Sequence, residues 1–424
     1  MNRSSSMVSE PAKKAADCVS QTRLLDNLAA LSRFGALASG GVNRQALSAE
    51  DLDARAWLID LAQSLGCEVS TDGCANLFIR RAGLQDLPPA VTGSHMDTQP
   101  CGGNLDGCYG VMAGIECIAA LNKAGIVTQR PVEVVVWTNE EGSRFAPGAM
   151  GSSAFVDPDR LADYLQSRDR DGVTVGAALA DCHRRFASLP RRATYPMAAF
   201  IELHIEQGPV LEQAGLSLAT VQGIQGVRWY QVRCLGQSAH AGTTPMGSRK
   251  DAMTLARRLA DRIEQGVADV PADQLRLTFG CWQVTPNAIN TVASEVSFTV
   301  DFRHPDAAVL ARFDVVMADL AADDVAVTPS LFQPPVAFDR HLLAQQQACC
   351  DVLDIPTGRL VSGAFHDAMY LARHCPTSMF FVPSRNGISH NPAEYTDPHS
   401  LWLGARALAC CLTELANPLT GVNS

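Results

Sequence analysis

The segment from Val132 to Trp137 most constrains the fold, because it is predominantly apolar on consecutive positions. A strand of that kind is typical of a sheet that is covered on both faces. Segments whose apolar residues follow helical spacing alternate with such strands, for example directly after Gly110. This alternation favours an α/β domain with a mixed sheet between helices.

The pattern changes from about Val221. Between Ser294 and Arg303 apolar and polar residues alternate strictly, which is typical of an antiparallel strand with one exposed face. Asp251 precedes a helix with a single apolar face. We therefore expect residues 221–332 to form an inserted α+β domain, and residues 1–220 and 333–424 to form the first domain together.

Composition narrows the class of protein. The chain has 424 residues, of which 47% are hydrophobic, enough for two domains. The net charge of −10 and the lack of a basic stripe argue against nucleic acid as a partner. No run reaches the roughly 18–20 apolar residues that a membrane span needs.

The amino-terminal residues and the cysteines suggest a reducing compartment. Residues 1–20 are polar, do not resemble a signal peptide, and are expected to be a disordered leader. The fourteen cysteines show no regular spacing, and the adjacent pairs Cys349-Cys350 and Cys410-Cys411 suit buried thiols better than a disulfide framework. We expect a cytoplasmic enzyme.

Residues 93–110 carry the first candidate site. This segment holds His95, Asp97 and Asp106, followed or interrupted by glycines that let the backbone turn tightly. Imidazole and carboxylate are ligands for divalent metal ions. Taken alone, the segment is better explained by a strand and a glycine-rich turn that bears a structural histidine, and only the segments downstream favour a metal site.

Three further segments strengthen the metal hypothesis. Glu140 and Glu141 follow the apolar strand, at the edge where ligands gather in open α/β sheets, although an acidic turn there could simply be solvated. His204 and His390 stand in two more strand or turn segments. Three imidazoles and two carboxylates are a ligand set for two divalent ions that share one carboxylate, and the remaining glutamate can act as a base.

With these segments the chain resembles the hydantoinase/carbamoylase family of amidohydrolases, within the M20-like dimetal hydrolases. The resemblance extends from about residue 22 and rests on six segments in the family's order: 93–114, 138–151, 202–212, 236–251, 287–303 and 362–394. It implies a dimetal aminopeptidase-like catalytic domain with an inserted dimerisation or lid domain.

The resemblance also implies the roles of the clustered residues. His95 and His204 would bind one divalent ion, Glu141 and His390 would bind the other, and Asp106 would bridge them. Zinc or manganese is expected foremost, with cobalt and nickel as alternatives. Asp97 would orient His95, a role that carboxylates often take. Glu140 would be the general base, which then passes its proton to the leaving nitrogen.

The inserted domain would complete the site, and the resemblance implies that its groups come from the partner subunit of a homodimer. His240 would stabilise the oxyanion, Asn290 would bind substrate, and Arg303 would pair with the substrate carboxylate through two hydrogen bonds. Gln207 and His366 would line the pocket. The chain departs from the family at Phe365, where relatives usually carry glycine.

The activity implied is hydrolysis of the ureido C–N bond of a small carboxylate-bearing substrate, an N-carbamoyl-L-amino acid or N-carbamoyl-β-alanine, to amino acid, ammonia and carbon dioxide. Allantoate amidohydrolase is the nearest alternative. A dimetal aminopeptidase or N-acyl deacylase would use the same ions. The non-enzyme alternative is a catalytically silent binding protein, against which the complete ligand set and Glu140 argue.

Overall fold

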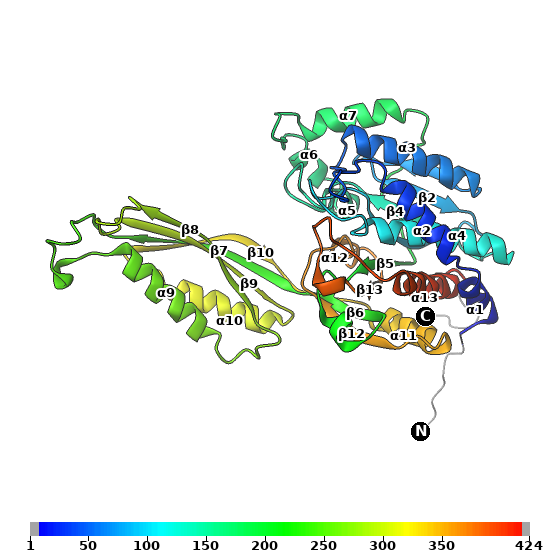
Figure 1. The fold of residues 1–424 in the computed structure, drawn as a ribbon. Coiled ribbons are helices and arrows are strands. Elements are labelled where there is room, and N and C mark those ends of the chain that lie inside the picture. The colour runs from blue at the N-terminus through cyan, green and yellow to red at the C-terminus, as the bar shows by residue number, and fades with distance from the viewer. Residues whose placement is uncertain (1–7, 418–424) are drawn as a thin grey trace, which may run out of the picture. The chain divides into compact units, whose positions relative to one another are not determined.

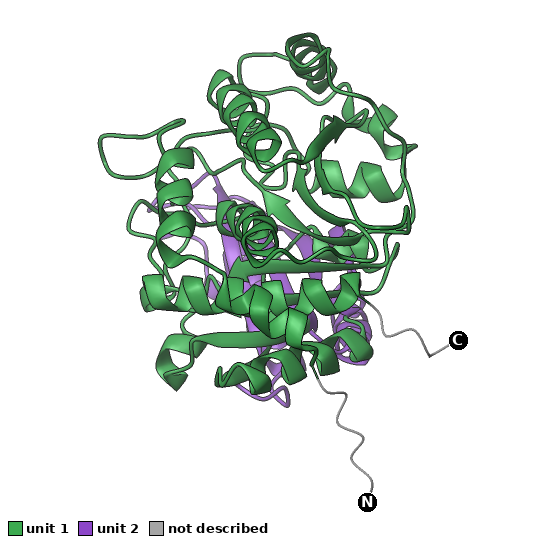
Figure 2. Cartoon of the chain, turned by 90° about the vertical axis from the view of Figure 1, so that its right-hand side faces the viewer, with its two compact units in different colours: residues 1–222, 338–424 green, residues 223–337 purple. Residues whose placement is uncertain are grey.

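The computed structural model describes residues 8–417 and divides into two compact units. The first runs to Gln222 and resumes at Phe338, and the second spans Gly223–Ala337, as the two colours of Figure 2 show. The second unit is thus inserted into the chain of the first. Residues 1–7 of the expected leader lie outside the described part.

The first unit is built on a mixed sheet of nine strands. The strand order is β1-β2-β4-β3-β5-β13-β6-β11, and β12 also pairs with β6. The strands are β1 Glu68–Thr71, β2 Leu77–Arg81, β3 Ala90–His95, β4 Val132–Trp137, β5 Ala199–Ile205, β6 Leu218–Ile224, β11 Val336–Ala337, β12 Thr357–Ser362 and β13 Thr377–Val382.

Helices surround this sheet (Figure 1). They are α1 Glu10–Asp17, α2 Gln21–Leu31, α3 Ala49–Ser64, α4 Cys108–Ala124, α5 Met150–Val156, α6 Arg160–Tyr164, α7 Val175–Arg185, α8 Val210–Ala214, α11 Arg340–Val352, α12 Ala368–Leu371 and α13 Pro398–Ala416, with a 3-10 turn at Arg385–Gly387. Helices α4 and α13 pack on β3 and β5, and α5 packs on β4.

Strand β4 confirms the expectation drawn from its apolar sequence. Every residue of β3, β4 and β5 is buried. Val134 and Val136 belong to the core that contains α4 and α13, whereas Trp137 packs on Phe155 of α5. Successive side chains of a strand point to opposite faces, so both faces of the sheet are covered. The expected mixed α/β sheet between helices is confirmed.

The expectation of a disordered leader is wrong for α1. Ser9 caps this helix by accepting a hydrogen bond from the Ala12 N–H, and its own N–H donates to Glu414 Oε1 at 2.8 Å. Ala12, Ala15 and Ala16 are fully buried, and α1 packs against α13 and α4. The small alanine side chains allow this close helix packing. They also make the segment only weakly hydrophobic, which is why the sequence suggested disorder.

The second unit is a four-stranded antiparallel sheet with two helices, ordered β10-β7-β9-β8. Its elements are β7 Gly226–Leu235, β8 Arg276–Thr285, β9 Glu295–His304, β10 Val325–Gln333, α9 Ala252–Gly266 and α10 Ala307–Ala318, with a 3-10 turn at Met246–Ser248. Residues 296, 298, 300 and 302 of β9 are buried, and the alternate residues are partly exposed. The one-sided sheet predicted from the alternation is present.

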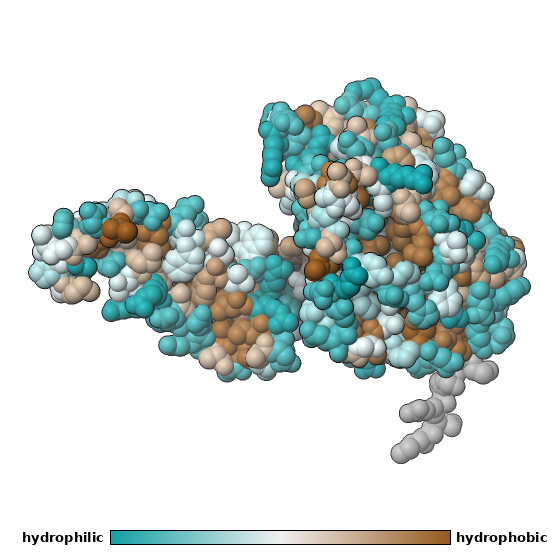
Figure 3. Space-filling model, viewed as in Figure 1, coloured by the Kyte–Doolittle hydropathy of each residue, from teal (hydrophilic) through white to brown (hydrophobic). Residues whose placement is uncertain are grey.

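The drawn face of the molecule is mostly hydrophilic, and its hydrophobic residues form separate patches (Figure 3). Within residues 8–417, no helix combines the length and apolarity needed to cross a bilayer. The adjacent cysteines Cys349-Cys350 and Cys410-Cys411 are buried thiols, as their adjacency in the sequence led us to expect.

Candidate dimetal site

Parallel strands bring the candidate ligands to one edge of the sheet. Strands β4, β3, β5 and β13 are neighbours and run in the same direction. His95 is the last residue of β3, His204 is next to last in β5, and Glu140 and Glu141 follow β4. His390 follows β13. Because carboxyl ends of parallel strands lie together, these residues converge although up to about three hundred positions separate them.

The turn before α4 brings Asp106 into the same place. Gly107 has φ of +64°, and a Cβ built there would lie 2.4 Å from the His95 ring. A Cβ at Gly110 would lie 2.3 Å from the carbonyl oxygen of Leu203 in β5. Only glycine therefore allows this helix start to approach the two histidine-bearing strands so closely.

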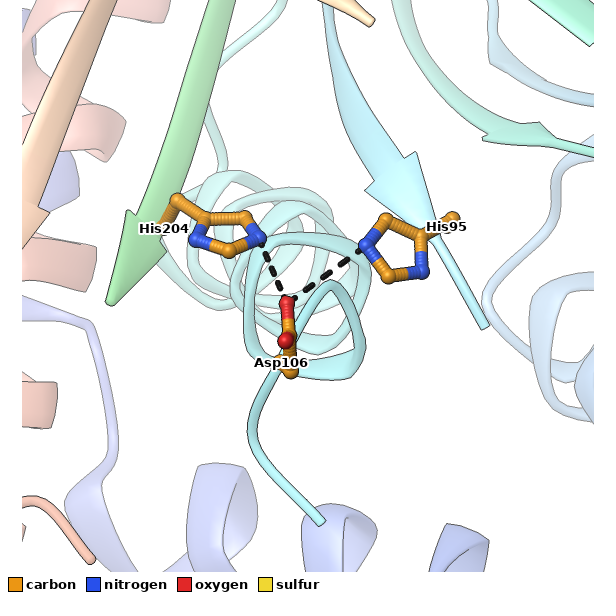
Figure 4. A group of neighbouring side chains, drawn as sticks. All are labelled: His95, Asp106 and His204. Atoms are coloured by element: carbon orange, nitrogen blue, oxygen red, sulfur yellow. Dashed lines mark ion pairs between the residues drawn. The ribbon is translucent and has the colours of Figure 1, made fainter. Parts of the chain in front are cut away.

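The first cluster contains His95, Asp106 and His204. Asp106 Oδ1 lies 3.6 Å from His95 Nε2 and 3.1 Å from His204 Nε2. Figure 4 shows both imidazoles directed at this carboxylate from two strands. The three side chains are almost completely buried, so a cation held between them would be shielded from water.

The second cluster uses the other oxygen of Asp106. His390 Nε2 lies 3.1 Å from Asp106 Oδ2 and 3.4 Å from Glu141 Oε2. The His390 side chain is 49% exposed, whereas that of Glu141 is 5% exposed. Each oxygen of Asp106 thus faces a different group of ligands, one buried and one that opens toward solvent.

The donor set and its spacing fit divalent ions. Charge-assisted hydrogen bonds between N and O usually measure about 2.7–2.9 Å, and the nitrogen–oxygen distances of the two clusters are longer, 3.1 to 3.6 Å. Ligand atoms around a four-coordinate ion with bonds of about 2.0–2.1 Å lie roughly 3.3 Å apart. The two groups, His95–Asp106–His204 and Asp106–Glu141–His390, each bring three ligand atoms within 4.8 Å of one another.

A third group of possible ligands, Glu202, His204 and His366, fits a cation less well. Glu202 already accepts hydrogen bonds from Ser94 Oγ at 2.7 Å and from the Ala368 N–H at 3.0 Å. His366 Nε2 is engaged with Ser362 Oγ at 3.0 Å. These groups are therefore satisfied by the protein itself.

Backbone carbonyls orient the two buried imidazoles. His95 Nδ1 donates to the Asp97 carbonyl and His204 Nδ1 donates to the Ile205 carbonyl, each at 2.9 Å. The Gly107 N–H points at His204 Nε2 at 3.1 Å. A neutral imidazole with a hydrogen on Nδ1 offers its Nε2 lone pair, which is the form that binds a metal ion.

Asp97 contributes differently from the prediction. Its main-chain carbonyl, and not its carboxylate, accepts the hydrogen bond from His95. The carboxylate instead accepts the N–H groups of Glu140 at 3.2 Å and of Glu141 at 3.1 Å. Asp97 therefore fixes the backbone that carries both glutamates, and it orients His95 through its own backbone.

Glu140 lies beside the first cluster, with Oε2 3.5 Å from His95 Nε2. Burial raises the pKa of Glu140 well above that of a free glutamate; His95 opposes this change, and the charges of Asp367 and Glu141 add to it. Burial followed by the charge of Asp106 raises the pKa of Glu141 to about 7. A bound cation would relieve this crowding of negative charge.

Two residues that the sequence did not single out support Asp106. Glu394 Oε1 accepts the N–H groups of Leu105 at 2.8 Å and of Asp106 at 3.1 Å. Ser389 Oγ lies 3.2 Å from Asp106 Oδ2 and 2.9 Å from Glu394 Oε2. The position of Glu394, four residues after His390, was the available signal, but a contact with backbone N–H groups leaves no pattern in sequence.

The two expected pocket residues of the first unit have different surroundings. Gln207 Nε2 donates to Asp106 Oδ2 at 2.8 Å, and Gln207 Oε1 is buried with no hydrogen-bond partner among residues 8–417. His366 is 1% exposed and packs edge-on against His204, with ring centroids 4.5 Å apart. Phe365 is partly buried next to it. Direct contact of these groups with substrate stays a prediction.

In the second unit, His240 and Asn290 are held side by side, and both side chains are exposed. The Ala241 N–H donates to the Asn290 carbonyl at 3.0 Å, and His240 forms a β-bridge with Thr291. The loop with His240 follows β7 and the loop with Asn290 precedes β9. Both therefore lie at the end of the sheet where Leu235 pairs with Glu295.

Arg303 stands at the other end of β9, opposite Val227. Its Nη2 lies 2.9 Å from Asp301 Oδ2. The eight residue steps from Glu295 to Arg303 span about 26 Å of extended strand. Arg303 and the His240 loop therefore lie at opposite ends of this sheet.

Comparisons with known proteins identify the family of this chain. The family model of peptidase family M20/M25/M40 matches residues 91–414. The N-carbamoyl-L-amino acid amidohydrolase of Geobacillus stearothermophilus is 35% identical over 93% of this chain and 98% of its own length. The allantoate amidohydrolase of Escherichia coli K12 is 37% identical over 91% and 96%.

Solved structures add the same family assignment. A hydantoinase/carbamoylase family amidase from Burkholderia multivorans superposes with a TM-score of 0.88 at 42% identity, covering 94% of this chain and 98% of that one. The range of the family model, residues 91–414, includes the second unit, much of the first unit and the positions of the five candidate ligands. These matches confirm the family resemblance seen in sequence. The chain belongs to peptidase family M20/M25/M40 and, within it, to the hydantoinase/carbamoylase group of amidohydrolases.

Proposed function

We propose that this chain is a dimetal hydrolase that cleaves the ureido C–N bond of N-carbamoyl amino acids to amino acid, ammonia and carbon dioxide. The observation that carries the proposal is that the two carboxylate oxygens of Asp106 face different groups of ligands. One of its oxygens faces His95 and His204, the other faces His390 and Glu141, and Glu140 lies beside them.

His95, His204 and Asp106 would hold one ion, and Asp106, Glu141 and His390 the other. When bound, two divalent ions supply a water of lowered pKa and polarise the ureido oxygen. Neutral imidazole and carboxylate donors suit zinc or manganese, and also cobalt or nickel. Glu140 Oε2 takes the proton of the attacking water and delivers it to the departing nitrogen.

The substrate carboxylate would pair with Arg303, His240 would stabilise the oxyanion, and Asn290 would bind the substrate. Since about 26 Å of strand separates these groups, we propose a homodimer whose composite site takes Arg303 from one copy and the His240 loop from the other. This modifies the expectation that one partner subunit supplies all three. Gln207 Oε1, buried and without a hydrogen-bond partner in the described part of the chain, is available to accept a hydrogen bond from the ureido group.

Mixing inactive variants tests the composite site. Take one chain with His240→Ala and a second with Arg303→Ala, each of low activity alone. If the two ends of a unit serve different sites, each mixed dimer contains one intact site, and random assortment restores about a quarter of wild-type activity. If both ends serve the same site, every site retains a defect and no activity returns.

Ammonia release from metal-reconstituted protein tests the reaction. The substrates are N-carbamoyl-β-alanine, several N-carbamoyl-L-amino acids, allantoate and a dipeptide. We expect turnover of an N-carbamoyl amino acid, and at least a hundredfold loss in Glu140→Gln with its ion content unchanged. Turnover of the dipeptide alone would overturn the proposal, as would full activity of Glu140→Gln.

Allantoate is the second candidate substrate, because it also carries a carboxylate and a ureido group, and because the chain is similar to an allantoate amidohydrolase. Preference for allantoate over every N-carbamoyl amino acid in the same panel, measured as kcat/KM, would replace the first candidate by this one.

A further inference from the structure

The loop that carries His240 binds its own imidazole. The N–H groups of Gly242 and Thr243 point at His240 Nδ1 at 3.0 and 3.3 Å. The Thr244 N–H closes the turn on the His240 carbonyl at 3.1 Å. Both backbone donors therefore meet at one ring nitrogen, and that nitrogen must accept.

The arrangement selects one tautomer. A neutral imidazole has one donor nitrogen and one acceptor nitrogen, and the hydrogen bond of one decides the state of the other. With Nδ1 accepting two N–H groups, the hydrogen resides on Nε2. The exposed edge of His240 therefore offers an N–H donor and not a lone pair.

Arg249 clamps the same turn from outside. Its Nη2 donates to the Ala241 carbonyl at 2.6 Å and its Nε donates to the Thr244 carbonyl at 3.0 Å. These carbonyls flank the two residues whose N–H groups bind Nδ1. A guanidinium holds its donors in a rigid fork, so it can bind both carbonyls at a fixed separation, whereas an ammonium group cannot.

The turn is held on its other side by the neighbouring loop. The Ala241 N–H donates to the Asn290 carbonyl at 3.0 Å, and the Val292 N–H donates to the Ala239 carbonyl at 2.8 Å. Ala241 is thus bound through its N–H by one segment and through its carbonyl by Arg249. The turn is fixed from two directions although it lies at the surface.

We propose that Arg249 is a positioning residue that, together with the Gly242 and Thr243 N–H groups, keeps His240 as a neutral donor from Nε2. The inference rests on the oxyanion role proposed above for His240. An oxygen that gains negative charge is stabilised by a donor already aimed at it. The other tautomer would direct a lone pair at that oxygen and would repel it.

Nitrogen NMR of protein labelled with ¹⁵N-histidine reads the tautomer directly, without substrate. The chain has ten histidines, and the His240 signals are those that disappear in His240→Gln. We expect the Nε2–H tautomer in the wild-type protein. An Nδ1–H tautomer there would overturn the proposal whatever the variants do.

Two variants test the positioning role. Arg249→Met should yield a mixture of tautomers and lower kcat about tenfold, a fraction of what direct loss of an oxyanion donor costs, while KM and ion content stay within about twofold. Gly242→Ala places a methyl group 3.3 Å from His240 Cε1, a tight contact that shifts the ring by a few tenths of an ångström and weakens its hydrogen bonds to the two donors. It should change the His240 signals in the same direction.

The matched control is Arg258→Met. Arg258 lines the same surface hollow as Arg249, but it is exposed and makes none of the carbonyl contacts. It should keep the wild-type tautomer and kcat. Equal effects of the two substitutions, or no effect of Arg249→Met on tautomer and kcat, would refute the positioning role.

The outcomes also separate this inference from the proposed function. If no ureido substrate is hydrolysed, the proposed function fails, while the NMR experiment still decides whether the tautomer is fixed and whether Arg249 fixes it. If ammonia is released but the tautomer is mixed in the wild type, only the inference fails.

Discussion

Replacing Glu394 with leucine tests whether a distant carboxylate holds the shared ligand in place. The change removes the acceptor of two buried N–H groups, those of Leu105 and Asp106. An unsatisfied buried donor costs about 1–3 kcal/mol, so the free energy of unfolding should fall by about 2–6 kcal/mol. The Asp106 turn should loosen, and the ions bound on both sides of Asp106 should be lost on dialysis.

Glu394→Gln tests whether the hydrogen bonds of this side chain or its negative charge hold the Asp106 turn. Its amide oxygen can accept the same two N–H groups, and its amide nitrogen can donate to Ser389 Oγ, so ion content should stay near that of the wild type. Glu414→Leu is the control for stability alone. Glu414 accepts the Ser9 N–H at 2.8 Å at the start of α1, and its loss should cost about 1–3 kcal/mol without loss of ions.

The assay combines urea denaturation in the presence of chelator with metal analysis of dialysed protein. Chelator removes the contribution of bound ions, so the first measurement reports the fold and the second reports the site. If Glu394→Leu keeps both its ions and its stability to within about 1 kcal/mol, the supporting role is wrong. If Glu414→Leu loses ions to the same extent, the effect is a general consequence of destabilisation.

Three further predictions concern the site. Gly107→Ala should abolish ion binding and activity, because its Cβ would lie 2.4 Å from the His95 ring. The control is Gly125→Ala, which is also at positive φ (+65°) but has nothing within 4 Å of the added Cβ. It should lower the free energy of unfolding by only about 1–2 kcal/mol and retain activity. Arg303→Lys should raise KM about tenfold with kcat little changed, since an ammonium group cannot form the bidentate pair; an unchanged KM would exclude Arg303 from carboxylate binding. Chelation should stop ammonia release and lower the thermal midpoint, zinc or manganese should restore both, and Asp106→Asn should show neither response to added metal; a metal-dependent midpoint in Asp106→Asn would place the ions elsewhere.

Local sequence pattern was sufficient for the elements that carry the site. The consecutive apolar residues from Val132 to Trp137 predicted a strand covered on both faces, and β4 has the same bounds. The alternation from Ser294 to Arg303 predicted a one-sided strand, and β9 differs from it by one residue at each end. In both strands the polarity of each residue reflects whether its own side chain is buried. The strands can therefore be predicted from the local sequence, without knowledge of the strands that pair with them.

The sequence also placed each candidate histidine and carboxylate in a strand or turn segment, and the family resemblance gave them roles. It could not show that the oxygens of Asp106 face separate ligand groups. That division depends on parallel pairing of β3, β4, β5 and β13, and the pairing is decided by packing across the whole sheet.

The remaining contacts were decided by tertiary structure alone. Glu394 accepts a hydrogen bond from the Leu105 N–H, 289 positions away in the chain. Asp97 accepts the main-chain N–H groups of Glu140 and Glu141. Arg249 donates to two main-chain carbonyls of the His240 turn. In each case a side chain binds main-chain N–H or carbonyl groups. Because every residue has a main chain, the amino-acid type of the partner residue does not reveal the contact. The sequence therefore determined which chemical groups this protein has at its strand ends, and the fold determined how they are aimed.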